Sequence, residues 1–176
     1  MVSDGIDANS AGKYTLARIQ PADNAAMAIV IRQGLTEFGA NRPGFAWQDP
    51  ELDDLSRAYI SDTTAYWVIR SREGVVGGCG IGRLHGVAHC CELQKMYVLA
   101  EHRGARLGAR LMEVALDFAA RHYQWCYLET LNGMAQAAAL YRQSGFIRLP
   151  QPIGQTGHNA CDHWYIKELN NNKING

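Results

Sequence analysis

Apolar side chains return every three or four positions in several parts of the chain, which is the spacing of one face of a helix. The pattern is clearest over residues 107–122, where it predicts an amphipathic helix. Further helices are predicted over residues 23–39, 51–59 and 132–144. In the last of these, Asn132 has a side chain suited to capping the first turn, and Gly145 ends the helix.

Alternating or continuous apolar runs predict the strands. These runs occupy residues 14–19, 65–71, 75–84, 91–99 and 125–130, with shorter ones from residue 146 and over 161–169. The run WCYLET is apolar at most positions, which is typical of a strand covered on both faces. Strands and helices in this order predict a mixed sheet flanked by helices, of the α/β or α+β class.

Residues 14–169 are predicted to form a single domain, because no linker, repeat or block of charge divides them. The polar, aperiodic ends, residues 1–13 and 170–176, are predicted to be flexible tails. A chain of 176 residues with 47% hydrophobic and 19% charged residues suits one globular domain of ordinary size.

Charge and hydropathy exclude several classes of protein. Lys and Arg together number 17, as do Asp and Glu, and this balance argues against nucleic-acid binding, which needs a cationic excess. No apolar run reaches the ~20 residues of a membrane-spanning helix, and the first residues carry no export signal. The chain is therefore predicted to be cytoplasmic, with its five cysteines as free thiols.

Potential metal ligands fall in two stretches, but their spacing is not that of a metal site. They are His85, His89, Cys90 and Cys91, and then His158, Cys161, Asp162 and His163. Adjacent ligands on a strand point to opposite faces, and no standard zinc spacing is present. No metal is predicted. His158, Asp162 and His163 are instead expected near a substrate pocket, together with Phe45, Trp47 and Tyr59.

The junction KMYVLAEHRGARLGARLM carries the strongest chemical signal in the sequence. A strand, a short loop and a helix follow one another, and main-chain N–H groups at the start of a helix have no partner within it. Together with the helix dipole they attract anions. Arg103, Arg106 and Arg110 add positive charge, and Gly104 and Gly108 allow a ligand to approach closely. The junction is therefore predicted to bind a pyrophosphate, although neither GxxxxGK[ST] nor GxGxxG is present.

This junction, the glycine-rich hairpin before it and the later stretch YLETLNGMAQAAALYRQSGF together resemble the GNAT superfamily of acetyl-CoA-dependent N-acetyltransferases. The family pattern Arg/Gln-x-x-Gly-x-Gly/Ala matches at Arg103 and Gly108, while Arg106 replaces the central glycine. A second pattern matches as Leu140-Tyr141-x-x-x-Gly145-Phe146. The resemblance implies a mostly antiparallel central sheet of six to seven strands flanked by about four helices.

The resemblance also implies which residues bind acetyl-CoA. Main-chain groups of Met96, Tyr97 and Val98 would pair with the pantetheine arm as an added strand would. The loop residues would surround the pyrophosphate: Arg103, Gly104, Ala105, Arg106, Leu107, Gly108 and Ala109. Tyr141 would lie near the thioester sulfur.

The chemistry that follows moves an acetyl group to a primary amine of a small molecule or a protein. Tyr141 would act as the general acid for the departing thiolate, since a tyrosine with a pKa of ~10 keeps its proton at neutral pH. Glu92 would act as the general base, directly or through water, on the same face of its strand as Gln94 and Met96. A main-chain N–H near Val98, where the strands are expected to diverge, would stabilise the oxyanion.

Two functions remain possible at this point, an active N-acetyltransferase and a non-catalytic module that binds or senses acyl-CoA. The second is kept because Arg106 and Met134 depart from the family patterns. Because the family often forms homodimers, a homodimer is also implied. The acceptor amine is not identified by any stripe of acidic or basic residues.

Overall fold

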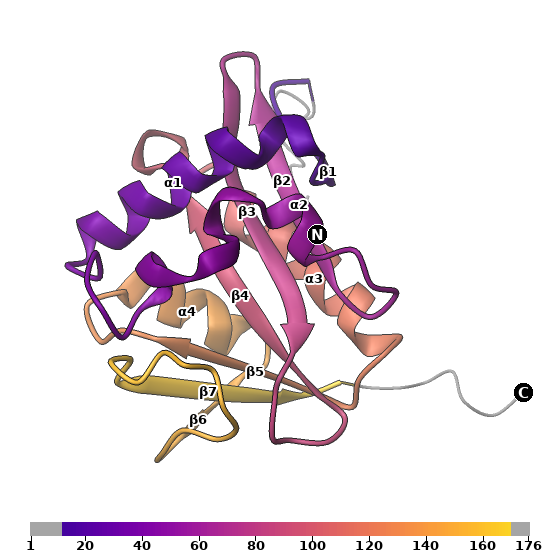
Figure 1. Cartoon of the computed structure of the whole chain (residues 1–176), viewed down its shortest axis with the longest axis vertical. Coiled ribbons are helices and arrows are strands. Elements are labelled where there is room, and N and C mark those ends of the chain that lie inside the picture. The colour runs from indigo at the N-terminus through magenta and orange to yellow at the C-terminus, as the bar shows by residue number, and fades with distance from the viewer. Residues whose placement is uncertain (1–11, 170–176) are drawn as a thin grey trace, which may run out of the picture.

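A computed structural model describes residues 12–169 and shows one seven-stranded sheet in the order β1-β2-β3-β4-β5-β7-β6 (Figure 1). Its strands are β1 (Thr15–Arg18), β2 (Ala65–Ser71), β3 (Gly74–Arg83), β4 (Cys90–Val98), β5 (Trp125–Thr130), β6 (Ile147–Leu149) and β7 (His163–Glu168). All neighbouring strands run antiparallel except β4 and β5, which are parallel. The predicted fold class, a mixed and mostly antiparallel sheet with flanking helices, is confirmed.

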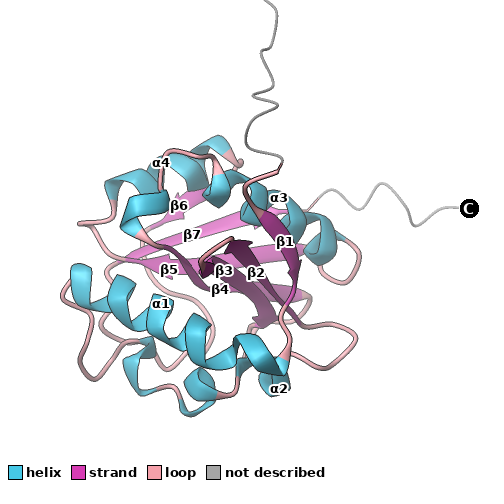
Figure 2. Ribbon diagram, turned by 90° about the horizontal axis from the view of Figure 1, so that it is seen from above, coloured by secondary structure: helices cyan, strands magenta, loops and turns pink. Residues whose placement is uncertain are grey.

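Helices cover both faces of the sheet. They are α1 (Asn24–Glu37), α2 (Leu55–Ala58), α3 (Leu107–Ala120) and α4 (Ala135–Gln143). Single turns of 3-10 helix lie at Pro21–Asp23, Ala46–Gln48, Pro50–Asp53 and Ala100–His102. Figure 2 shows α1 and α2 on one face and α3 and α4 on the other.

Two large apolar cores follow from this layering, and a third, small cluster contains Leu84, Cys90 and Tyr127. The core under α3 contains buried side chains such as Leu111, Phe118 and Trp67. The core under α1 contains Met27, Ile31 and others. Alternation along the strands divides their side chains between the two cores, as a period of two requires.

The parallel pair β4–β5 is short. Cα partners run from Cys90 with Trp125 to Glu92 with Tyr127, and β4 then continues to Val98 without further pairing to β5. The two strands therefore diverge in the middle of the sheet. An opening between diverging parallel strands is where α/β proteins commonly bind ligands.

A β-bulge interrupts β4 next to this opening. Gly78 pairs with Tyr97 while Gly80 pairs with Gln94, so β4 has one residue more than β3 over this stretch. Lys95 lies at the bulge with a φ of 48°, in the left-handed region that non-glycine residues rarely adopt.

The bulge changes which way the side chains point and corrects one expectation. Glu92 and Gln94 face the α1 layer, where Gln94 accepts a hydrogen bond from Tyr59. Met96 packs against the α3 core instead. The prediction that Glu92 and Met96 share a face is therefore wrong, because the extra residue shifts the alternation by one position.

Most element boundaries lie within two residues of the prediction, and two helices differ by more. The helix predicted to start at Asn132 begins at Ala135, after a turn closed by the bond from the Met134 N–H to the Leu131 carbonyl. Asn132 is therefore not its cap, and its main-chain N–H donates to Asp162. The helix predicted over 51–59 is divided into Pro50–Asp53 and α2, because Asp54 lies outside helical geometry.

Among residues 12–169, no helix combines the length and apolar character needed to cross a bilayer. The predicted tails, residues 1–13 and 170–176, lie outside the described residues except for residues 12 and 13. The five cysteines are free, and Cys90 and Cys91 point into different cores as predicted.

Candidate active site

A wide groove of about 890 Å³ crosses the end of β4. We call it the outer groove. It is bounded by the last residues of β4, by the loop and first turn of α3, and by α4. Its walls include Met96, Tyr97, Val98, Arg103, Gly104, Arg106, Leu107, Gly108 and Ala109. All the residues predicted to bind acetyl-CoA therefore line one hollow, with the exception of Ala105.

The start of α3 forms the side of this groove that is predicted to bind an anion. Arg106 precedes the helix with a φ of 56°, so the chain turns into α3 through the left-handed region. The N–H groups of the first turn, which lack partners within a helix, belong to residues that line the groove. A Cβ on Gly108 would lie 3.2 Å from the Leu140 side chain, so glycine keeps the groove wide here.

Arg103 has a second role that the sequence pattern did not reveal. Its guanidinium donates to both carboxylate oxygens of Glu37 at 2.6 and 2.7 Å, and its Nε donates to the Val98 carbonyl at 3.1 Å. The side chain thus ties the end of α1 to the end of β4. Glu37 also lowers the net positive charge of this side of the groove.

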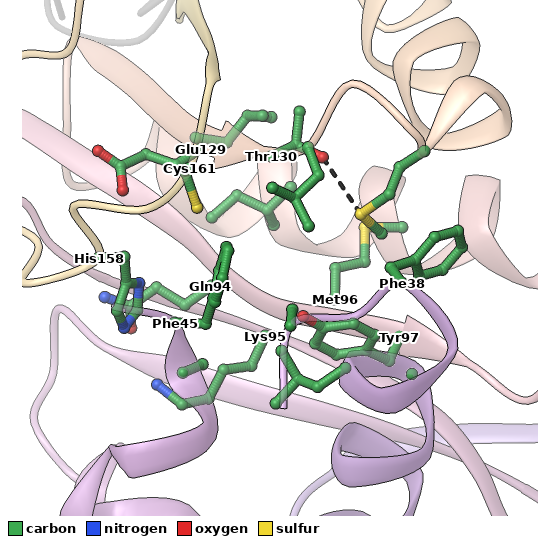
Figure 3. Close-up of a pocket in the computed structure, with 18 of the residues that line it drawn as sticks. Phe38, Phe45, Gln94, Lys95, Met96, Tyr97, Glu129, Thr130, His158 and Cys161 are labelled. Atoms are coloured by element: carbon green, nitrogen blue, oxygen red, sulfur yellow. Dashed lines mark hydrogen bonds between the residues drawn. The ribbon is translucent and has the colours of Figure 1, made fainter. Parts of the chain in front are cut away.

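A smaller cavity of about 80 Å³ lies between the diverging strands β4 and β5. We call it the inner cavity. Figure 3 shows side chains from both strands, from the α1 region and from the segment around His158 and Cys161 pointing into it. Five residues line both hollows: Phe38, Met96, Tyr97, Met134 and Tyr141. The inner cavity and the outer groove therefore meet at these residues.

Tyr141 lies at this junction. It projects from α4 and packs against the rings of Phe146 and Tyr165, with centroids 6.1 and 5.8 Å away. Burial raises the pKa of the Tyr141 hydroxyl above its ordinary value, so the group keeps its proton at neutral pH. The spacing of Tyr141 and Phe146 in the sequence is explained by this ring contact across the turn at Gly145.

Glu92 lines the inner cavity and is nearly fully buried. Gln94 donates to its Oε2 at 2.7 Å, and Tyr59 donates to Gln94 at 2.7 Å, which fixes both side chains. Burial raises the pKa of Glu92 to about 7. The carboxyl group is therefore poised to change its protonation state near neutral pH, as a general base requires.

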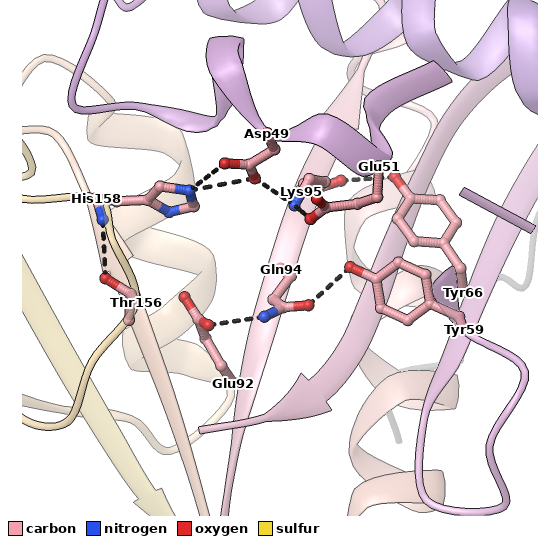
Figure 4. A network of polar contacts seen from close by, with 9 residues as sticks. All are labelled: Asp49, Glu51, Tyr59, Tyr66, Glu92, Gln94, Lys95, Thr156 and His158. Atoms are coloured by element: carbon pink, nitrogen blue, oxygen red, sulfur yellow. Dashed lines mark hydrogen bonds and ion pairs between the residues drawn. The ribbon is translucent and has the colours of Figure 1, made fainter. Parts of the chain in front are cut away.

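A cluster of ion pairs closes one end of the inner cavity (Figure 4). The Lys95 ammonium, 3% exposed, contacts Asp49 at 2.6 Å and Glu51 at 2.9 Å. His158 Nε2 lies 2.9 Å from the same Asp49. Burial alone would lower the pKa of His158, but the bond to Asp49 outweighs it and raises that pKa. This cluster holds the segment after α1 against β4 and was not predicted.

Glu92, Glu129 and His158 are the described residues whose metal-ligand atoms come together, all within 4.8 Å of one another. The spacing would suit one shared cation. Each of the three side chains already has a hydrogen-bonding partner in the protein: Gln94, Tyr127 with Thr156, and Asp49, respectively. The His and Cys ligands considered from the sequence are not brought together as a set within residues 12–169.

Other expectations for the substrate pocket are met in part. Phe45 and His158 line the inner cavity, whereas Trp47, Asp162 and His163 do not. Tyr59 acts through its bond to Gln94. The sequence reasoning missed Lys95 and Glu129, and it also missed Asp49, Glu51, Glu37 and Met134.

Comparison with known proteins agrees with this architecture. The sequence-family model of the acetyltransferase (GNAT) domain matches residues 62–148. The uncharacterized N-acetyltransferase YjgM of Escherichia coli is 40% identical over 157 residues, which cover 88% of this chain and 94% of that protein. An uncharacterized N-acetyltransferase of Schizosaccharomyces pombe is 30% identical over 127 residues, covering 72% and 77%.

Solved structures show the same fold. An acetyltransferase of the GNAT family from Staphylococcus aureus superposes with a TM-score of 0.77 at 18% identity, over 89% of this chain and 99% of that one. The acetyltransferase yncA of Salmonella typhimurium, solved with acetyl-CoA, gives a TM-score of 0.70 at 19% identity, over 92% and 97%. The chain belongs to the GNAT family of acetyltransferases, and its class of activity is acyl transfer.

Proposed function

We propose that this protein transfers the acetyl group of acetyl-CoA to a primary amine of a small molecule or a protein, by direct attack within a ternary complex. The observation that carries the proposal is the junction of the two hollows at Met96, Tyr97 and Tyr141. A thioester entering along the outer groove and an amine held in the inner cavity would meet there. Holding two reactants together in this way removes much of the entropic barrier to their reaction.

The outer groove suits coenzyme A in two respects. Beyond Glu92, the β5-facing edge of β4 has no strand partner among the described residues, so the main chain of Met96, Tyr97 and Val98 is open to an extended pantetheine arm, apart from the Val98 carbonyl, which accepts a hydrogen bond from Arg103. The first turn of α3 offers N–H groups to the diphosphate. The Salmonella relative solved with acetyl-CoA shares this fold and supports the same co-substrate here.

Glu92 is the proposed general base. The acceptor arrives as an ammonium, because an alkylamine has a pKa of ~10.4, and it must lose a proton before its nitrogen can attack. Glu92 lines the inner cavity, and burial raises its pKa to about 7, so its carboxylate accepts this proton at neutral pH directly or through a water molecule.

Tyr141 is the proposed general acid. The amine nitrogen forms a bond to the thioester carbon, the carbonyl oxygen becomes an oxyanion, and the carbon–sulfur bond then breaks. The departing thiolate takes a proton from the Tyr141 hydroxyl, which is still protonated because burial raises its pKa. The second proton that the amine nitrogen loses as the amide forms returns to the Tyr141 oxygen through water, and the oxyanion becomes the carbonyl of the amide. A main-chain N–H near Val98 is the proposed oxyanion donor, next to the point where β4 leaves β5.

The test combines calorimetry with acetyl-CoA and release of free thiol across a broad panel of primary amines. We expect saturable binding of acetyl-CoA and thiol release that depends on both protein and amine. Reactions without amine measure hydrolysis and serve as the control. Binding with no release on any amine would favour the non-catalytic alternative.

A further inference from the structure

The carboxylates around the inner cavity fall into two groups with different partners. Asp49 and Glu51 are paired with the cations Lys95 and His158. Within residues 12–169, the hydrogen bonds that Glu129 receives come from neutral donors, Tyr127 at 2.8 Å and Thr156 at 2.7 Å. These donors stabilise the carboxylate without neutralising its charge.

Glu92 is in the same situation as Glu129. Its hydrogen-bonding partner is the neutral amide of Gln94, and no ion pair joins Glu92 to a basic side chain of the described residues. One carboxylate oxygen of Glu92, one of Glu129 and one ring nitrogen of His158 lie within 4.8 Å of one another beside the cavity. A buried pair of like charges is costly unless a cation compensates it.

The two basic residues that line the inner cavity compensate only part of this negative charge, because Lys95 and His158 face four carboxylates, those of Asp49, Glu51, Glu92 and Glu129. The Lys95 ammonium is 3% exposed and held by two carboxylates. His158 Nε2 is bonded to Asp49. Neither is therefore available to receive an acidic group on the substrate.

The size of the inner cavity restricts what can reach the two glutamates. It measures about 80 Å³. A buried apolar cavity of about 150 Å³ accommodates a benzene molecule. A space of about half that size beside the carboxylates suits an ammonium group on a short unbranched alkyl stem better than it suits an aromatic ring. Leu35, Phe45 and Leu128 provide apolar contacts for such a stem.

We infer that the acceptor is an unbranched aliphatic primary amine, bound as its ammonium ion between Glu92 and Glu129, with no carboxylate on the carbon that bears the amine. This inference rests on the proposed function and narrows its substrate class. An α-amino acid would bring its own carboxylate against the glutamate pair, and like charges placed together across a binding site cost several kcal/mol. The ammonium compensates the remaining negative charge on binding and then gives a proton to Glu92 before the nitrogen attacks.

The experiment compares pentylamine, L-norleucinamide and L-norleucine as acceptors with acetyl-CoA and the native protein. Pentylamine is norleucine without its carboxylate, and the amide keeps the branch but removes the charge. We expect kcat/KM for pentylamine to exceed that for norleucine about 100-fold, with the amide between them. Norleucine used as well as pentylamine, or better, would overturn the inference.

Glu129→Gln tests the source of the preference. Removing one charge of the pair should raise KM for pentylamine and reduce the ratio of pentylamine to norleucine about tenfold, and an unchanged ratio would contradict the assignment. Glu113→Gln, an exposed change on α3, is the matched control and should leave the ratio as it is. The comparison of substrates on the native protein stands even if Glu129→Gln does not fold.

The outcomes also separate this inference from the proposed function. A protein that binds acetyl-CoA and releases no thiol with any amine refutes the proposed function itself. A protein that acetylates other amines but not pentylamine, or prefers the amino acid, refutes the substrate class alone.

Discussion

The outer groove and the inner cavity share Met96, Tyr97 and Tyr141, yet they are built in different ways. The groove is wide, and the side predicted to bind an anion is formed by the loop and first turn of α3, where main-chain N–H groups have no partner within the helix. The cavity is roughly a tenth of that volume, and titratable side chains from distant segments line it. Main-chain groups are suited to holding a ligand common to a whole family, and side chains are suited to selecting an acceptor and moving its proton. Changes in the groove should therefore alter the affinity for acetyl-CoA, while changes in the cavity should alter turnover.

The largest effect is expected from Tyr141→Phe at the junction. Loss of the general acid should lower kcat by about 10²- to 10⁴-fold while the Kd for acetyl-CoA changes little. Thiol release and calorimetry measure the two quantities. Tyr165→Phe, a neighbouring buried tyrosine that does not line either hollow, is the control and should keep its activity. Full activity in Tyr141→Phe would remove this residue from the chemistry.

Glu92→Gln tests the proposed general base in the inner cavity. Only the ionised carboxylate accepts a proton, so with a pKa of about 7 the native kcat/KM should fall tenfold per pH unit below pH 7 and level off above it. At pH 8 the kcat/KM of the variant should be about 100-fold below the native value. The variant should also lack the tenfold fall per pH unit below pH 7. A fall that persists near pH 7 in the variant would assign it to another group.

His158→Gln should weaken the ion cluster that closes the cavity and leave the groove intact. The pKa of His158 is higher in the folded protein than its unfolded value of 6.5. Protonated His158 therefore stabilises the fold fully below pH 6.5, and this stabilisation is lost as the pH rises through the pKa of the folded state. The variant should lose about 1–2 kcal/mol of unfolding free energy at pH 6 and less at pH 9. Denaturant titrations measure this, with the exposed His85→Gln as control. An equal loss at both pH values would show that the imidazolium is not what stabilises the cluster.

Arg106→Gly should give the smallest change and concerns the groove. Glycine removes the cost of the left-handed conformation at φ 56°, which stabilises the fold by about 1–2 kcal/mol. Its greater freedom in the unfolded chain destabilises the fold by about 0.5–1 kcal/mol. We expect a Tm higher by about 2 °C and acetyl-CoA binding weakened about fivefold or less. Arg106→Ala keeps the strained backbone and is the comparison for Tm. A lower Tm for the glycine variant than for the alanine variant would contradict the strain.

The difference between the two hollows also decides what the sequence could predict. Strand and helix periodicities are local, so the order of elements and the fold class could be read from apolar spacing and from the resemblance to the family. The loop from Arg103 to Ala109 is local too, and all its residues but Ala105 line the groove. The start of α4 was misplaced because a turn after Leu131, and not the side chain of Asn132, sets where the helix begins.

The inner cavity could be predicted only in part. Glu92 lines it as expected, but Asp49, Lys95 and His158 are far apart in the sequence and meet through tertiary packing. No local pattern marks such a cluster. The bulge at Lys95 was also missed, since a lysine at positive φ has no sequence signal of the kind glycine gives.

That single inserted residue in β4 has a consequence for how the protein can diversify. It turns Met96 toward the α3 layer and leaves Glu92 and Gln94 facing the α1 layer, so under the proposed function one strand would serve the coenzyme and the acceptor at the same time. Gain or loss of a residue at the β4 bulge would move the following side chains to the opposite face of the strand. It would therefore disrupt the outer groove and the inner cavity together. Exchange of side chains at fixed strand length would damage only one. New acceptor preferences are therefore accessible by point mutation around the inner cavity, whereas insertions and deletions in β4 are not a viable route.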